Sequence, residues 1–575
     1  MNTLQLRKPV LLGLILNLVC LLAARAQNGN TNIWFGPGAG LNNWSTALNW
    51  TNATTGTQSG LVGGDDVKMF STGGTTQSNV DNVVDVNIAI GSLVFGSTNN
   101  ATLHTTLIND GVVLSVTNTG GFSVGTVTDP AAGLSLTNTV TGANGTLAIS
   151  NASANIGINQ ANASLNPSRA TLDLSGLGNF QVTASRLGIG DAAFPGVPVA
   201  QHTGGNLILA KTNVISLSYA DTLANYRTAG KNYSIVMSRN AGNNPGIISL
   251  LQLGITNAFF VDSLDIGMDK SGNNSTAAHG VVMFNPAFGA NAPTAYFRGV
   301  NGATDPTSRI TWWGVGDGNS SASSSNGGGG TNDFSLGSID VLVNTLSLAR
   351  DAASSSDTWA GPHKGVFTFT SGTVDANTLI VGNQSLETGT STAACWGQMN
   401  VNGANAVLKV ESTLTLGNTT ISTAAGLNTR GQLSINGGTV YASNIVVGAA
   451  SITNLVTINS GTLVVSNALA TNAAGLFTFN ITNSTLGLTV TPDASTKVLT
   501  KVLATAGTAN TIRLDPATVI FPSYPQQFPL IKYTSWTNGV NNFALAGVPA
   551  WAPGATIVSN GVNASVDLLV PTDPR

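Results

Sequence analysis

Charged residues are scarce in this chain of 575 residues: Asp, Glu, Lys and Arg make up 8% of it, against roughly 25% in a typical globular protein. The net charge is −3, and no basic stripe follows Lys8, so the charge pattern of a nucleic-acid binder is missing. Hydrophobic residues nevertheless account for 42% of the chain, which argues against disorder. The composition therefore predicts a folded protein that does not bind nucleic acid.

Cysteine and histidine are also rare. Of the two cysteines, Cys20 lies in an N-terminal segment that we expect to be removed, which leaves Cys395 without an intramolecular partner. We interpret Cys395 as a small buried residue and not as a nucleophile. The histidines show no spacing that puts two on one face, and we expect each of them in a loop; they are His104, His202, His279 and His363. The sequence therefore assigns no metal ligand, no cofactor and no catalytic residue. The stretches Gly63-Gly64-Asp65 and Gly316-Asp317-Gly318-Asn319 are similar to calcium-binding nonapeptides but do not repeat in tandem, which leaves Ca²⁺ binding open.

The apolar run from Val10 to Leu22 is shorter than the roughly 20 residues that a membrane-spanning helix needs. It follows Arg7 and Lys8 and precedes Ala24-Arg25-Ala26. This order of basic, apolar and small residues is typical of a secretory signal peptide. We therefore expect residues 1–26 to be a signal peptide cleaved near Ala26/Gln27, and a mature chain at the cell surface or secreted, without a transmembrane segment.

What the chain does contain is a recurring nine-residue phrase, apolar-x-apolar-x-x-Leu/Ile-x-apolar-Gly/Ala. Side chains of a strand alternate between two faces, and the two consecutive x positions in the middle of the phrase invert this alternation. The apolar residues on both sides of these positions can stay inside only if the backbone turns a corner there. This pattern predicts an all-β fold, a right-handed parallel β-helix (a solenoid). The phrase occurs at Ile88–Gly96, Val182–Gly190, Phe259–Gly267, Val341–Ala349, Val374–Gly382 and Val440–Gly448.

Polar positions between the strands are filled by Asn, Thr, Ser and Gly. These residues suit stacked turns, and we expect their amides and hydroxyls to pair with equivalent residues in the windings above and below. We assign the repeats to residues 81–494, with loop insertions near 220–257 and 320–331.

The two ends of the chain differ from its middle. Residues 27–80 are rich in Trp and Gly, and we interpret Trp34, Trp44 and Trp50 as parts of an N-terminal cap that covers the open end of the stack. The alternative is an aromatic platform for sugar rings. Residues 495–575 contain frequent Pro, which suits edge strands, and we assign them to a C-terminal β cap.

The densest aromatic and basic cluster of the middle region comprises Trp312, Trp313, Arg298 and Arg309. Indole faces stack on sugar rings and guanidinium groups bind acidic groups, so these four are candidate glycan-contact residues. The alternative is a loop packed onto the stack.

Carboxylate pairs are the feature that an enzyme of this fold would need. They occur at Asp65-Asp66, at Asp81 with Asp85, and at Asp262 with Asp265. Asp262 falls at the corner of its winding, and Asp265 points outward by its phase in the strand. The alternative role of such residues is to cap turns.

Three short motifs carry a resemblance: Asn43-Trp44 with Asn49-Trp50, then residues 65–70, then residues 91–96. They resemble the opening of secreted bacterial proteins with autotransporter-associated β-strand repeats, and residues 528–533 and 565–570 are similar to the end of their repeat regions. The resemblance implies a passenger-like parallel β-helix displayed at or released from the cell surface, without catalytic residues. This chain departs from the pattern in lacking a membrane barrel.

Two hypotheses of function follow. The first, which the sequence favours, is an extracellular structural or adhesive protein whose polar surface contacts polysaccharide or other copies of the chain. The second is a β-helical carbohydrate-active enzyme, a polysaccharide lyase or glycoside hydrolase, that uses paired carboxylates.

Overall fold

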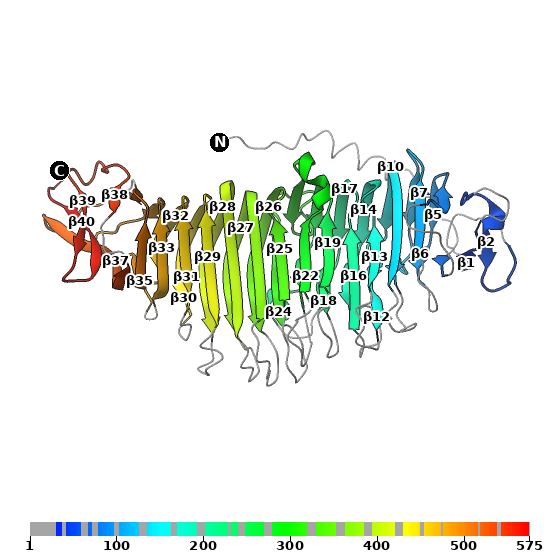
Figure 1. Cartoon of the computed structure of the whole chain (residues 1–575), viewed down its shortest axis with the longest axis horizontal. Coiled ribbons are helices and arrows are strands. Elements are labelled where there is room, and N and C mark those ends of the chain that lie inside the picture. Colours follow the sequence, from blue (N-terminus) through cyan, green and yellow to red (C-terminus); the bar gives the residue numbers. More distant parts are fainter. Residues whose placement is uncertain are drawn as a thin grey trace.

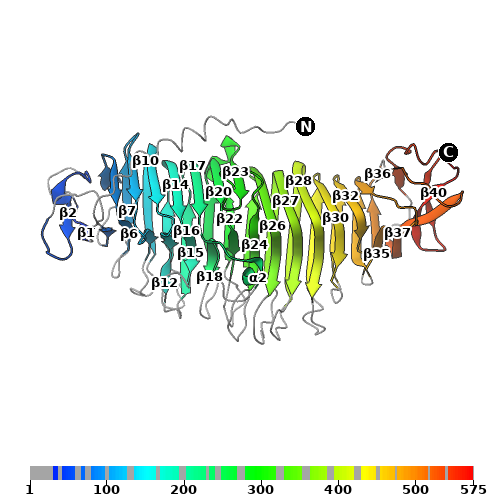
Figure 2. The same ribbon diagram turned by 180° about the vertical axis from the view of Figure 1, so that it is seen from behind.

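The chain forms one long row of β-strands (Figure 1), with its N-terminal strands at one end of the row and its C-terminal strands at the other. Figure 2 shows the same row from behind. The computed structural model describes residues 30–36, 42–58, 67–71, 79–96, 103–125, 135–162, 169–192, 202–227, 232–239, 248–268, 279–318, 329–351, 363–384, 394–419, 429–448, 453–472, 475–515, 518–537 and 542–573. Residues 1–26, the predicted signal peptide, lie outside these ranges.

The strands fall into three stacks, in each of which a strand pairs in parallel with its counterpart from the next winding. Strands of the first stack, in order, are β4 (Asn82–Val84), β7 (Leu103–Ile108), β10 (Leu136–Ser150), β13 (Ala170–Asp173), β16 (His202–Ile208), β19 (Ile248–Leu253), β22 (His279–Phe284), β25 (Gly329–Phe334), β27 (His363–Gln384), β28 (Cys395–Thr419), β29 (Arg430–Asn436), β31 (Leu455–Asn459), β33 (Leu476–Thr482), β35 (Val498–Ala506) and β37 (Gln526–Thr537).

The second stack shares the long strands β10, β27 and β28 with the first. Its other strands are β5 (Ile88–Ile90), β8 (Val113–Val116), β14 (Leu177–Ala184), β17 (Thr212–Leu217), β20 (Thr256–Phe260), β23 (Thr294–Arg298), β26 (Ser338–Asp351), β30 (Thr439–Val447), β32 (Thr462–Leu469), β34 (Thr485–Leu488), β36 (Asn510–Leu514) and β38 (Phe543–Leu545).

The third stack ends in the C-terminal parts of β26, β27, β28, β30 and β32. Its other strands are β1 (Thr31–Trp34), β3 (Val67–Phe70), β6 (Ser92–Phe95), β9 (Phe122–Val124), β11 (Asn155–Ile158), β15 (Arg186–Asp191), β18 (Ile235–Arg239), β21 (Ser263–Ile266) and β24 (Ile310–Gly318). The chain is therefore all-β and built mainly from parallel strands, which confirms that part of the prediction.

The repeated phrase spans the corner between the second and third stacks. In the third copy, Phe259 and Val261 precede the corner, Leu264 and Ile266 follow it, and all four lie in the core. The inversion of the alternation thus marks the corner, as predicted. In four of the six copies the phrase ends on a residue with left-handed backbone: Gly190, Gly267, Ala349 and Gly382, with φ of +81° at Gly267 and +58° at Ala349. Glycine adopts this conformation without strain.

The buried apolar residues of all three stacks form one continuous cluster from Trp34 to Val570. At its N-terminal end, the rings of Trp34 and Trp44 pack edge-on against Trp50, with centroids 4.9 and 5.1 Å away. All three indoles are buried. Their position favours a cap over an exposed platform for sugars.

Two boundaries expected from the sequence are wrong. Residues 220–257 are not an insertion throughout, because β18 and β19 lie within them and pair in register with the windings on both sides. The departure from the rhythm is the segment before β18, which contains the short helix α2 (Leu223–Tyr226). Of the second expected insertion, 320–331, residues 320–328 lie outside the described ranges and 329–331 begin β25.

The C-terminal cap also begins later than residue 495. Strands β35, β36 and β37 continue the parallel stacks, and closure comes from antiparallel pairing of β40 (Ser565–Val570) with β37 and with β39 (Thr556–Asn560). Three further elements lie at the edges: β2 (Trp50–Asn52), η2 (Ala47–Asn49) and β12 (Gln160–Asn162). The helix η3 (Pro286–Asn291) joins β22 to β23.

The expectation that each histidine lies in a loop is wrong, since His104, His202, His279 and His363 all lie in strands of the first stack. The prediction for Cys395 is confirmed, because its side chain is buried. Within the described ranges, no helix is long and apolar enough to cross a membrane.

Candidate functional site

The two tryptophans of the predicted glycan-contact patch are inside the protein. Trp313 is 0% exposed and belongs to the main core. Trp312 is 1% exposed and packs with Tyr226, Tyr233 and other residues in a second apolar cluster outside the third stack, to which α2 contributes Tyr226. Neither indole face is therefore accessible to a sugar ring.

The two arginines of the predicted patch join neighbouring windings. Arg298 donates to the backbone oxygen of Asp340 and, at 2.9 Å, to Oδ1 of the same residue. Arg309 donates to Asp375 Oδ1 at 2.7 Å and to the backbone oxygens of Val343 and Asp375. The structure therefore corrects the prediction of an exposed patch at these four residues: their side chains stabilise the stack, which agrees with the alternative of a packed segment.

A buried carboxyl pair lies near Trp312. Asp265 and Asp317 come from successive windings and are both 0% exposed. Burial raises the pKa of Asp265 well above its ordinary value, and the neighbouring Asp317 carboxylate raises it further. Burial also raises the pKa of Asp317, although Arg350 opposes the shift by donating from Nε to Asp317 Oδ1 at 2.9 Å. The guanidinium of Arg350 in turn lies 4.7 Å from the centroid of the Trp312 ring.

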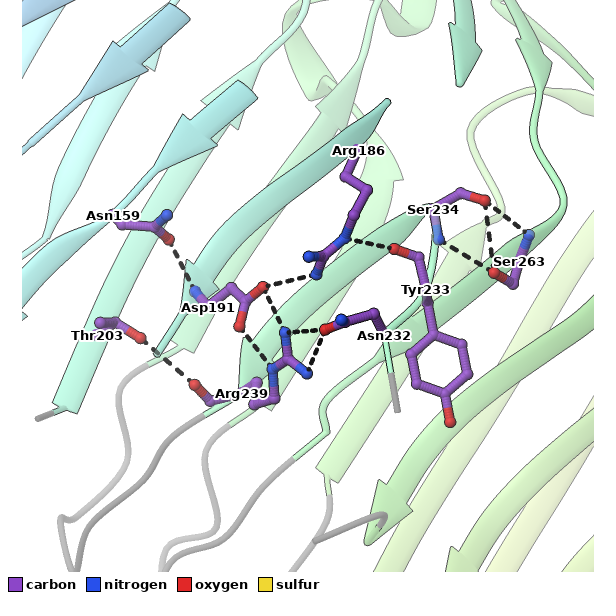
Figure 3. Close-up of polar contacts among 9 residues, drawn as sticks. All are labelled: Asn159, Arg186, Asp191, Thr203, Asn232, Tyr233, Ser234, Arg239 and Ser263. Carbon is purple, nitrogen blue, oxygen red and sulfur yellow. Dashed lines mark hydrogen bonds and ion pairs between the residues drawn. The ribbon is translucent and has the colours of Figure 1, made fainter. Parts of the chain in front are cut away.

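A second buried ionic group lies further towards the N-terminus on the same stack, where Figure 3 shows two guanidinium groups directed at Asp191. Arg239 donates to Asp191 through Nε at 2.6 Å and through Nη2 at 2.8 Å. Arg186 donates to the same carboxylate at 3.4 Å and to the backbone oxygen of Tyr233. Burial lowers the pKa of Arg186, whereas for Arg239 the effect of burial is outweighed by Asp191, and the pKa is raised.

Asp262 does not form a pair with Asp265. Its Oδ2 accepts from the Tyr226 hydroxyl and its Oδ1 accepts from Thr311 Oγ1 at 2.6 Å. Asp262 thus fastens α2 to the stack.

The predicted pair of Asp81 with Asp85 is not formed either. Asp81 lies 2.6 Å from His104 Nδ1, while Asp85 accepts from Ser45. Asp65 and Asp66 lie outside the described residues.

These buried groups have the residue types of a catalytic site but not its access. A carboxyl group with a raised pKa can act as a general acid only where substrate can reach it. Asp265 and Asp317 are fully buried. As folded, they can hold a proton, but they cannot contact a polysaccharide.

An open recess lies instead on the outer face of the first stack. It has a volume of about 180 Å³ and is lined by Lys364, Val366, Trp396, Gly397, Gln398, Arg430 and Gln432, from strands β27, β28 and β29. We call it the Trp396 recess.

Register brings the residues of the Trp396 recess together. Lys364 pairs with Trp396, which pairs with Arg430, so the three form one outward row across three windings. The Arg430 guanidinium lies 3.9 Å from the Trp396 ring centroid, and the Lys364 ammonium lies 5.9 Å from it. Gly397 faces inward beside this row, where a Cβ would come within 2.2 Å of the backbone nitrogen of Gly382. Only glycine therefore fits at position 397.

The outer face around the recess carries amide and hydroxyl groups that bond between windings. Asn400 donates to Thr368 Oγ1 at 2.9 Å, and Asn480 donates to Thr457 Oγ1 at 3.2 Å. Near the other end of the stack, Asn206 donates to Thr171 Oγ1 at 3.3 Å. The predicted pairing of polar side chains between windings is confirmed at these positions.

Sequence reasoning missed the Trp396 recess. Lys364, Trp396 and Arg430 are far apart in the chain. The signal that could have joined them is their spacing of about one winding, the same spacing as between Val341 and Val374 of the repeated phrase.

In a comparison with known proteins, no family model, curated protein or solved structure matches the chain.

Proposed function

We propose that the protein is an extracellular structural or adhesive protein, a right-handed parallel β-helix whose polar outer face contacts polysaccharide. The parallel pairing of each strand with its counterpart in the next winding, repeated in three stacks, supports the β-helix form of the fold. A row of windings with a sparsely charged outer face suits a protein that bears contacts along its length.

The observation that carries this proposal is the Trp396 recess. Polysaccharide sites in proteins combine an aromatic ring with amides and charged groups that fix the orientation of the sugar. The recess has these parts on a surface that is open to solvent: Trp396, the amides of Gln398 and Gln432, and two cations.

The burial of the carboxyl pair favours a binding role over an enzymatic one. A glycosidase needs two carboxyl groups on either side of the scissile bond, about 5 to 10 Å apart and open to substrate. Asp265 and Asp317 are close together, but neither is exposed.

Secretion and surface display are part of the proposal. They rest on the order of basic, apolar and small residues in 1–26, and on the resemblance of residues 43–50 and 91–96 to autotransporter-associated β-strand repeats. The scarcity of charge and the reliance on hydrogen bonds between windings are compatible with a protein that works outside the cell.

A retention assay tests the proposal. The purified protein is run through gels that contain plant, algal or bacterial polysaccharides, and retardation measures binding. We expect retardation by at least one polysaccharide, and about a tenfold weaker affinity for Trp396→Ala, equivalent to about 1.4 kcal/mol.

The matched control is Tyr441→Ala. Tyr441 is 45% exposed and pairs with Lys409 on the second stack, so it is another aromatic residue beside a lysine, on another face. Its removal is expected to leave retardation unchanged. Release of sugar from the same polysaccharides, abolished by Asp265→Asn, would contradict the proposal and favour the carbohydrate-active enzyme.

A further inference from the structure

The two cations of the Trp396 recess have no anionic partner within the described part of the chain. Lys364 and Arg430 are both exposed. Among the described residues, neither side chain forms an ion pair or a hydrogen bond, and no residue that lines the recess carries a carboxylate. Because the chain has only 22 basic residues, two unpaired cations in one recess form a local positive site on a surface that is otherwise sparsely charged.

Arg430 is held ready for an anion by its contact with Trp396. At 3.9 Å from the ring centroid, its guanidinium lies over the indole, which limits the conformations of the side chain. A guanidinium in that position keeps N–H groups free at its edge, and these can donate in pairs to a carboxylate or sulfate. Part of the cost of ordering the arginine is thus met before binding.

The spacing of the two cations suits a linear polymer. Lys364 and Arg430 flank Trp396 by one winding on each side, so their backbones are about 9.6 Å apart. This separation is comparable to the length of a disaccharide unit. A chain lying along the stack would therefore place charged groups of alternate sugars at the two cations.

We infer that the Trp396 recess binds acidic polysaccharide, with Lys364 and Arg430 contacting the carboxylate or sulfate groups of one glycan chain. This inference rests on the proposed function and names the class of polysaccharide. Charge complementarity selects the glycan. The amides of Gln398 and Gln432 donate from Nε2 to Asn400 Oδ1 and Ser434 Oγ, and their Oε1 atoms can accept from the hydroxyl groups of the glycan.

The test compares two forms of one polymer. Polygalacturonate carries a carboxylate on each sugar, and its methyl ester has the same backbone without the charge; dextran sulfate and unmodified dextran form a second pair. Affinity is measured by gel retardation and by calorimetry for the unmodified protein, for the double variant Lys364→Gln/Arg430→Gln, and for the control Lys409→Gln, an exposed lysine of the second stack. Both exchanged residues are at the surface, and circular dichroism verifies that each variant is folded.

We expect a charged polymer to bind at least tenfold more tightly than its uncharged form. The double variant should lose about tenfold of that affinity, and the control should lose none. Raising the salt concentration should weaken binding by the unmodified protein and affect the double variant less.

Three results would overturn the inference. Equal binding of charged and uncharged polymers would refute the anion selection while leaving the proposed function intact. An unchanged affinity of the double variant would refute the site. Retention by single-stranded DNA as strong as by the acidic polysaccharides would show a general polyanion surface instead of a glycan site. Absence of binding to every polysaccharide would refute the proposed function itself.

Discussion

The buried ionic group at Asp191 provides a strong test of how the windings are held together. The side chain of Asp191 is 0% exposed, and those of Arg186 and Arg239 are 9% and 12% exposed. Asp191→Asn keeps the shape of the side chain but leaves two buried guanidinium groups without a countercharge. Removing one member of a buried ion pair costs about 3–5 kcal/mol, and we expect a loss of this size.

Local hydrogen exchange measures this loss where it arises. The amides of β15 and β18 exchange through opening of the windings that Asp191 joins, so their rates should rise roughly a hundredfold to several thousandfold. Amides of β31 and β33, which lie far along the stack, should be unchanged, because each winding contacts mainly its neighbours.

Asp340→Asn is the matched control. Asp340 also pairs with an arginine of a neighbouring winding, but its side chain is 52% exposed, and Arg298 keeps its bonds to backbone oxygens. An exposed pair contributes about 0–1 kcal/mol, so this variant should be nearly neutral. If Asp191→Asn destabilised the protein no more than Asp340→Asn, the assignment of Asp191 as a buried ionic anchor would be refuted.

Three further predictions concern the corners, the carboxyl pair and the covered tryptophan. Gly267→Ala should lower the free energy of unfolding in denaturant by at least about 1–2 kcal/mol, because the new Cβ would lie 1.8 Å from the backbone oxygen of Gly329 and φ at this position is left-handed. Ala349→Gly, at the equivalent end of another copy of the phrase, should change the free energy of unfolding by no more than about 1 kcal/mol. The pKa of Asp265 is raised in the folded protein, so protonated Asp265 contributes stability that is fully present below the unfolded pKa of about 3.9 and is lost as pH rises through the folded pKa. Asp265→Asn should therefore reduce the fall of the unfolding midpoint with rising pH and have the higher midpoint at pH 8. An equal fall of the midpoint in both proteins would contradict this. Trp312→Ala should lower stability by about 3–5 kcal/mol but leave polysaccharide retention of the folded protein unchanged, and a selective loss of retention would restore the predicted glycan contact.

The corner between strands could be predicted because it is a local property. The phase change between Val261 and Leu264 follows from the order of apolar residues alone, and the glycine at position 267 follows from the left-handed backbone. The outward orientation of Asp265 was likewise readable from its place between Leu264 and Ile266. Its burial was not, because it depends on tertiary packing outside the third stack.

The site residues were harder to predict because they depend on register. Trp312 and Trp313 stand together in the sequence, but alternation sends Trp313 into the core and Trp312 into the second apolar cluster. Conversely, Lys364 and Trp396 are remote in the sequence and meet only because β27 and β28 pair as they do. Unequal lengths between windings obscure that register in the sequence.

The register of β27 on β28 is therefore the claim on which the recess and its proposed ligand depend, and a cysteine cross-link measures it directly. Thr368 and Asn400 face each other across these windings, so Thr368→Cys/Asn400→Cys in a Cys395→Ser background should form a disulfide on mild oxidation, since paired backbones at about 4.8 Å lie within the range that a disulfide spans. Thr368→Cys/Gln398→Cys, displaced by two residues, should remain reduced under the same conditions. Efficient cross-linking of the displaced pair, with none of the aligned pair, would contradict the register and with it the recess.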